Sequence, residues 1–165
     1  MELEDGALNE LRLGAITAID GLWFIAVEQR LGFEAAFELD LQVWKSYGQV
    51  QLKRLARLLG VALEADSPPD LATVNSLVEA LCRIDGTESA WEMLDEETSV
   101  FRVYGCPWWD NLRASGRSEL VNCELVDNTL FADWLEKLDP GIEMEITRSL
   151  PRGDEHCEWI LRRSR

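Results

Sequence analysis

The run Ile142-Glu143-Met144-Glu145-Ile146-Thr147 alternates apolar and polar side chains without a break. Because successive side chains of a β-strand point to opposite faces, this alternation predicts a strand with one buried face and one wet face. A turn-forming run, Pro151-Arg152-Gly153-Asp154, and then an apolar run, Cys157-Glu158-Trp159-Ile160-Leu161, follow it. This last part of the chain therefore predicts two antiparallel strands joined as a hairpin.

Upstream of this hairpin, two more strands are expected, at residues 88–94 and 99–106. The acidic run Asp95-Glu96-Glu97-Thr98 separates them, and residues 100–104 are rich in β-branched and aromatic side chains. Helices are expected at 108–115 and 119–138, with Gly116 between them. The second part of the chain, residues 87–165, is thus predicted to be an antiparallel sheet of about four strands with two helices.

Residues 1–86 have a different pattern, because apolar side chains recur there at steps of three and four residues. Helices are expected at 8–31, 33–59 and 71–83, and Gly32 and Gly60 follow the first two as natural C-terminal stops. The predicted fold class is α+β: an N-terminal helical layer followed by the sheet, in a single domain over residues 1–165.

The composition is that of a folded globular chain. Of 165 residues, 47% are hydrophobic and 28% charged, which excludes a disordered chain. Sixteen Lys and Arg stand against 31 Asp and Glu, a formal net charge of −15. Such a charge repels phosphate, so the sequence argues against nucleic acid and against anionic membranes as partners. The sequence leaves open whether the helical half covers a pocket or forms a homodimer interface.

A cytoplasmic location is expected. The start, Met1-Glu2-Leu3-Glu4-Asp5, is acidic, unlike the first part of a signal peptide. The apolar stretch 13–27 contains Thr17, Asp20 and two glycines, and it is too short and too polar to span a bilayer. Four cysteines without a signal peptide indicate free thiols or metal ligands and not a disulfide framework.

The side chains suited to chemistry are spread thiols and acids, and the common catalytic motifs are absent. Cys106 ends a predicted strand, and Cys123 lies four residues before Asp127, which places both on one helix face. Cys157 follows His156, the single histidine. Zinc would suit three thiols together with Asp127 or His156, although gaps of 17 and 34 residues without a C-x-x-C pair are a weak signal. The candidate metal ligands are Cys106, Cys123, Cys157 and His156.

Simpler interpretations exist for the same residues. A free cysteine is most often a small buried hydrophobe, and Cys82, beside the apolar stripe of the third helix, is expected in the core. Asp20 interrupts an apolar helix face next to Trp23, so it is either hydrogen-bonded and structural or lines a pocket. Trp108 and Trp109 follow Cys106, and at most one of them can form an aromatic wall for a planar ligand.

These residues resemble a known family. The pattern Cys106-Pro107, then Cys123 with Asp127, then the turn Asp139-Pro140, then Gly153-Asp154 with Cys157-Glu158-Trp159 resembles the L-2-amino-thiazoline-4-carboxylic acid hydrolase family over the last third of the chain. Residues 18–24, AIDGLWF, are similar to a set of uncharacterised bacterial and archaeal cytosolic proteins. The closing Gly-Asp-x-x-Cys is also similar to that of the vinyl-reductase-type ligand-binding domains, which implies an α+β ligand-binding fold.

The first resemblance implies a hydrolase that opens a cyclic substrate of the 2-amino-thiazoline-4-carboxylate type to N-carbamoyl-cysteine. Such chemistry needs a base for water, a proton donor and an anchor for the substrate carboxylate. Within the matched motif, the catalytic candidates are Cys123, Asp127 and Cys157. The carboxylate anchor would be Arg102, Arg148 or Arg152. The candidate substrate-binding residues are Asp20, Trp23, Cys106, Trp108 and Asp154.

Two further hypotheses belong to other classes. In one, the same thiols form a non-catalytic sensor module that binds a ligand or a metal. In the other, the chain is a structural or assembly partner with no site. Convergence of the three motif cysteines in space would favour the first two hypotheses over the third.

Overall fold

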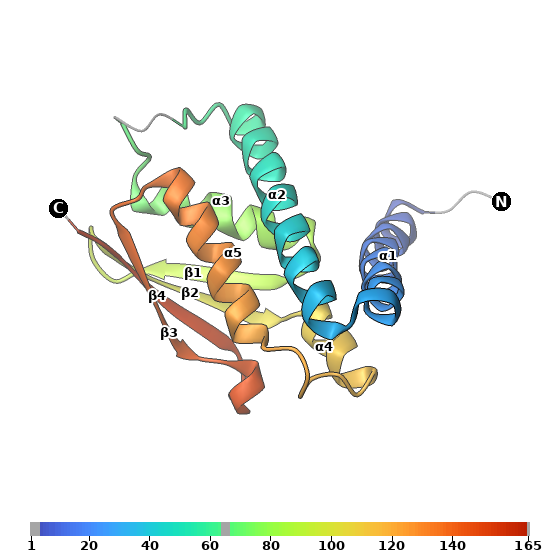
Figure 1. Ribbon diagram of the computed structural model, residues 1–165. Coiled ribbons are helices and arrows are strands. Elements are labelled where there is room, and N and C mark those ends of the chain that lie inside the picture. Colours follow the sequence, from blue (N-terminus) through green and yellow to red (C-terminus); the bar gives the residue numbers. More distant parts are fainter. Residues whose placement is uncertain (1–3, 64–66, 165) are drawn as a thin grey trace. The chain divides into compact units, whose positions relative to one another are not determined.

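The computed structural model describes residues 4–63 and 67–164 (Figure 1). The start Met1-Glu2-Leu3 therefore lies outside the described residues. The described part contains five α-helices, three of which precede the first strand, and a four-stranded antiparallel sheet, so the α+β prediction is confirmed. The chain divides into two compact units, residues 1–44 and 45–165. The division falls inside a helix, not at residue 86 where the sequence pattern changes.

The first unit contains α1 (Asp5–Leu31) and the beginning of α2 (Phe33–Leu59). Gly32 joins the two helices with φ 88°, a conformation that favours glycine. The ring of Phe33 lies 5.9 Å from that of Phe24 and 5.9 Å from that of Phe37. α1 has no buried residue, and Ile19 is 70% exposed. The apolar face expected on this helix is therefore not a core face.

The second unit is organised around the sheet. Its strands are β1 (Glu88–Met93), β2 (Thr98–Gly105), β3 (Ile142–Arg148) and β4 (Cys157–Arg163). The spatial order is β1-β2-β4-β3, with every neighbouring pair antiparallel. The expected hairpin is present as β3 and β4, which are joined through the short 3-10 helix η1 (Leu150–Arg152). One row of paired residues crosses the whole sheet on its apolar face: Trp91, Phe101, Trp159 and Ile146.

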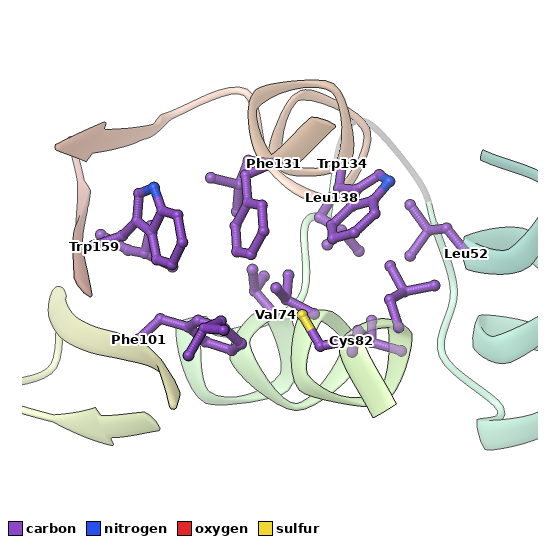
Figure 2. Packing of buried hydrophobic residues seen from close by; sticks show 14 of the residues in the cluster. Leu52, Val74, Cys82, Phe101, Phe131, Trp134, Leu138 and Trp159 are labelled. Atoms are coloured by element: carbon purple, nitrogen blue, oxygen red, sulfur yellow. The ribbon is translucent and has the colours of Figure 1, made fainter. Parts of the chain in front are cut away.

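Two helices, α3 (Leu71–Ile84) and α5 (Cys123–Leu138), pack beside this apolar face (Figure 1). Asp70 caps α3, since its Oδ1 accepts the Thr73 N–H at 2.7 Å. Figure 2 shows Phe131, Trp134 and Leu138 of α5 pointing toward Val74 and Cys82 of α3. Phe101 and Trp159 of the sheet and Leu52 of α2 belong to the same cluster. This shared core explains why the second half of α2 belongs to the same unit as the sheet.

Most element boundaries agree with the sequence patterns, with one clear difference. The helix expected over 119–138 begins only at Cys123, while α4 (Pro107–Ala114) lies close to its predicted range. The reason is local, because Asn122 is the N-cap of α5 and its Oδ1 accepts the Leu125 N–H at 3.1 Å. Among the described residues, no helix combines the length and the apolar character that crossing a membrane requires.

Replacing Gly48 in the middle of α2 by Ala is expected to destabilise the protein by about 1–3 kcal/mol. A Cβ at Gly48 would clash with Nε1 of the Trp134 indole. This overpacking outweighs the roughly 0.5–1 kcal/mol that Ala normally gains over Gly in a helix. Urea unfolding measures the change, with Gly14→Ala as control, because a Cβ at Gly14 meets nothing within 4 Å. Equal stability of the two variants would show that α5 does not pack this closely on α2.

Candidate functional site

The three motif cysteines come from three different elements, and Asp127 shares α5 with Cys123. Cys106 is the N-cap of α4, where its Sγ accepts the Trp109 N–H at 3.5 Å. Cys123 is the first residue of α5, Asp127 follows one turn later, and Cys157 begins β4. The carboxylate of Asp127 acts electrostatically on all three thiols. The three motif thiols therefore share the electrostatic surroundings of one carboxylate.

A fourth thiol, that of Cys82, belongs to the same surroundings. Cys82 is buried in the hydrophobic cluster, as the sequence predicted. The charges of Asp85 and Asp127 and the thiol of Cys106 nevertheless act on it. Because Cys82 lies on α3, far from the motif in the sequence, no pattern in the chain indicated its proximity to Asp127.

All four cysteines are free, and their surroundings keep them protonated. Burial, with the nearby Asp127 charge, raises the pKa of Cys106 to about 12 and that of Cys157 to about 11. The same causes raise the thiol pKa of Cys123 and of Cys82 further. Since the thiolate is the nucleophilic form of cysteine, these thiols are poor nucleophiles at neutral pH.

Unlike the thiols, Asp127 can change its protonation state near neutral pH. Burial raises the pKa of its carboxyl to about 7, which makes it able to give or take a proton near neutral pH. Its nearest polar partner is the Cys123 thiol, with Sγ 3.9 Å from Oδ2. No Lys, Arg or His within residues 4–63 and 67–164 forms an ion pair with Asp127. The site thus contains one uncompensated carboxyl group among neutral thiols.

The Gly-Asp-x-x-Cys motif forms a closed loop at the start of β4. Gly153 has φ 90°, and Asp154 accepts the backbone N–H of Ser149 on Oδ2 at 2.7 Å. Leu150 N–H in turn donates to the Sγ of Cys157 at 3.3 Å. Asp154, expected to bind substrate, therefore holds the loop that positions the Cys157 thiol.

Arg152 lies beside this loop and forms a bidentate pair with Glu124. Its Nε lies 2.7 Å from Oε1 and its Nη2 lies 2.6 Å from Oε2. The Cys157 thiol acts electrostatically on Arg152. The sequence did not single out Glu124, because an isolated acid 28 residues from its partner has no distinguishing pattern. A half-exposed guanidinium with a forked geometry suits a carboxylate ligand.

The other two candidate arginines lie on the charged face of the sheet. Arg102 Nε lies 2.7 Å from Glu158 Oε2, and Arg148 lies 3.9 Å from the same carboxylate. His156 also belongs to this network: its Nε2 lies 3.7 Å from Glu158 and its ring lies 5.4 Å from that of Tyr104. These contacts place His156, which directly precedes β4, with the charged side chains of the sheet and not with the Cys157 thiol.

The remaining predicted site residues occupy different places. Trp108 is half-buried in the first turn of α4, two residues after Cys106. Asp20 and Trp23 belong to the first unit, where Asp20 Oδ1 accepts the Trp44 indole N–H at 2.8 Å. Among the described residues, no group of three or more His, Cys, Asp or Glu side chains is arranged to hold a metal ion. The zinc ligand set stays a prediction.

Comparison with known proteins places the chain in a family. Residues 8–161, nearly its whole length, match the model of a family of unknown function, DUF6125. No curated protein matches the chain. Because the match covers both the helical half and the thiol-bearing half, the chain belongs to the DUF6125 family.

Proposed function

We propose that this protein is a small-molecule hydrolase that opens a cyclic amidine-type substrate, of the 2-amino-thiazoline-4-carboxylate kind, with Asp127 as its acid and base. The observation that carries the proposal is the uncompensated Asp127 carboxyl among thiols, with its pKa raised by burial to about 7. A group with this pKa is half deprotonated at neutral pH, which is the condition for efficient general acid–base catalysis.

The reaction needs one proton to be moved twice. Asp127 takes a proton from water while the water oxygen bonds to the ring carbon between nitrogen and sulfur. The bond from that carbon to the ring sulfur then breaks, and Asp127 returns the proton to the departing sulfur, which leaves as a thiol. Substrate plus one water equals N-carbamoyl-cysteine, so no other reactant is required.

The neighbouring residues would bind the substrate and not attack it. Arg152 already forms a bidentate guanidinium–carboxylate pair with Glu124. The substrate carboxylate would replace Glu124 in this pair. Cys106, Cys123 and Cys157 would provide a neutral lining around the ring. The raised pKa of Cys123 and of Cys157 argues against covalent catalysis by either thiol.

The wider setting of the proposal follows from the sequence. The proposal includes a cytoplasmic location and a small-molecule partner, and the net charge of −15 argues against binding of nucleic acid or an anionic membrane. A homodimer stays open.

Hydrolysis of 2-amino-thiazoline-4-carboxylate by the full chain tests the proposal. Asp127→Asn is expected to lower kcat by about 10²- to 10⁴-fold. The matched control Asp110→Asn removes an exposed carboxylate of α4 and is expected to leave kcat unchanged. In the wild type, kcat/KM is expected to rise as the pH increases toward 7 and Asp127 loses its proton. A Cys123→Ser variant with no activity, beside an active Asp127→Asn variant, would instead identify a thiol nucleophile.

A second candidate is a non-catalytic ligand- or metal-binding module, favoured by the grouping of four free thiols around one carboxyl. Saturable binding of the thiazoline without turnover, lost in Asp127→Asn, would support this module over the hydrolase. One zinc ion per chain, lost when Cys106, Cys123 and Cys157 are replaced together, would support its metal-binding form. If the full chain neither hydrolyses the thiazoline nor binds it or zinc, both candidates are overturned.

A further inference from the structure

Two carboxyl groups meet between the helices of the first unit. Asp20 of α1 and Asp40 of α2 hydrogen-bond to each other through their side chains. The indole N–H of Trp44, one turn after Asp40, donates to Asp20 Oδ1 at 2.8 Å. Oδ1 of Asp40 is buried and has no hydrogen-bond partner. Neither carboxyl takes part in the chemistry proposed above.

A hydrogen bond between two carboxyl groups exists only when one of them carries a proton, because two carboxylates have no donor between them. Repulsion between two neighbouring carboxylates also disfavours ionisation of both groups. The groups that face the pair from α1 and α2 are the two carboxyls themselves and the Trp44 indole. Within the described residues, no Lys, Arg or His forms an ion pair with Asp20 or Asp40, so no cation compensates a second negative charge.

We propose that the Asp20–Asp40 pair is a proton-controlled latch, which holds α1 against α2 while the carboxyls share a proton and releases it when both are ionised. Contacts that link the two helices include the Trp44–Asp20 hydrogen bond and the Phe24–Phe33 ring contact. Since α1 has no buried residue of its own, losing the bond between the carboxyls is expected to loosen α1 on α2.

The direction of the pH response follows from linkage. Burial, and then the Asp20 charge, raises the pKa of Asp40 to about 7, and burial raises the pKa of Asp20 as well. In an open hairpin both carboxyls return toward the ordinary value of 3.8. Opening of the hairpin therefore releases a proton. The equilibrium constant for opening rises about tenfold per pH unit between pH 3.8 and pH 7 and is constant above about pH 7.

The latch is separate from the proposed hydrolase, since it lies wholly within residues 1–44. It also gives Asp20 a role that does not require contact with a substrate. Failure of either proposal leaves the other intact.

Hydrogen–deuterium exchange of α1 in the full-length protein tests the latch, measured from pH 5.5 to 8 and corrected for the intrinsic pH dependence of exchange. In the wild type, protection around Asp20 is expected to fall about tenfold between pH 6 and pH 7, and little above pH 7.5. Asp40→Asn keeps a donor for Asp20 but removes the Asp40 proton, so its loss of protection with rising pH is expected to be much smaller than in the wild type, with the remainder coming from Asp20. Asp20→Asn removes the like charge beside Asp40 and is expected to shift the loss of protection to lower pH.

Glu38→Gln is the matched control, because it removes an exposed charge from the same helix two residues away. It is expected to follow the wild type at every pH. A wild type without any loss of protection would overturn the latch. The same loss in Asp40→Asn as in the wild type would overturn it equally, since the response would then come from other groups.

Discussion

Asp127→Asn is expected to make the protein more stable at pH 8 by about 2–4 kcal/mol, while it removes the proposed activity. Burial raises the pKa of Asp127 from 3.8 to about 7, and each unit of such a shift is worth about 1.4 kcal/mol. A raised carboxyl pKa stabilises the protein below the unfolded value, and that stability is lost as the pH rises toward 7. Asparagine has no charge to bury, so it avoids this cost. Loss of the Cys123 contact reduces the gain.

Urea unfolding at pH 5.5 and pH 8 measures this effect. The wild type is expected to be less stable at the higher pH, and Asp127→Asn to show a smaller difference between the two. A residual pH dependence remains in the variant, because burial also raises the pKa of Asp85 to about 6 and that of Asp40 to about 7. Asp110→Asn, at an exposed position, is the control and should behave as the wild type. An Asp127→Asn variant less stable than the wild type at pH 8 would mean that the carboxylate is solvated or paired with a cation.

A gain in stability combined with a loss of turnover is diagnostic of a functional carboxylate. Buried charges at binding and catalytic sites are retained at a cost in stability, because the reaction needs them. A carboxyl retained only for structure would show the opposite sign, since its removal would leave a partner unsatisfied. The sign of the stability change in this one variant therefore separates a functional carboxylate from a structural one, and that sign is measured without a substrate.

The fold was largely predictable because its elements have strong local patterns. The strict alternation over 142–147 and the three- and four-residue steps over 8–31 and 33–59 depend only on residues close in sequence. The start of α5 was mispredicted by four residues, because capping by Asn122 prevailed over the apolar pattern that begins earlier. The exposure of α1 was not predictable either, since periodicity indicates a helix and not what covers it.

The site was predictable where the chain itself sets the geometry. Cys123 and Asp127, one helical turn apart, lie on one face of α5 as expected. The proximity of Cys106 and Cys157 depends on strand order, which no local pattern specifies. The contacts of His156 with Glu158 and Tyr104 separate it from the Cys157 thiol, although the two residues are adjacent in sequence. Asp154 has a structural role in the loop that only the hydrogen bond to Ser149 shows.

Trp159 connects the core of the second unit to Asp127. Its side chain is 1% exposed, and its ring stacks on that of Phe131 with centroids 4.7 Å apart (Figure 2). Its Nε1 donates to Oδ1 of Asn128, the residue after Asp127, at 3.2 Å. One side chain thus fixes α5 against β4 both through apolar packing and through a hydrogen bond beside the carboxyl.

Trp159→Ala is expected to cost about 3–5 kcal/mol in the free energy of unfolding, through lost burial and the cavity that remains. That is a large fraction of the roughly 5–15 kcal/mol by which most domains are stable. Trp159→Phe retains an aromatic ring against Phe131 and loses chiefly the bond to Asn128, so its cost is expected to be about 1–2 kcal/mol. Urea unfolding at pH 5.5, where Asp127 is mostly protonated, measures both costs.

The pH dependence of the two variants then separates packing from positioning. Water that enters the cavity of Trp159→Ala would solvate Asp127 and lower its pKa toward 3.8, so the loss of stability between pH 5.5 and pH 8 should become smaller than in the wild type. Trp159→Phe, without such a cavity, should keep the wild-type difference. If both variants keep it, the aromatic stack stabilises the fold without shielding the carboxyl, and the raised pKa of Asp127 must depend on its thiol neighbours instead.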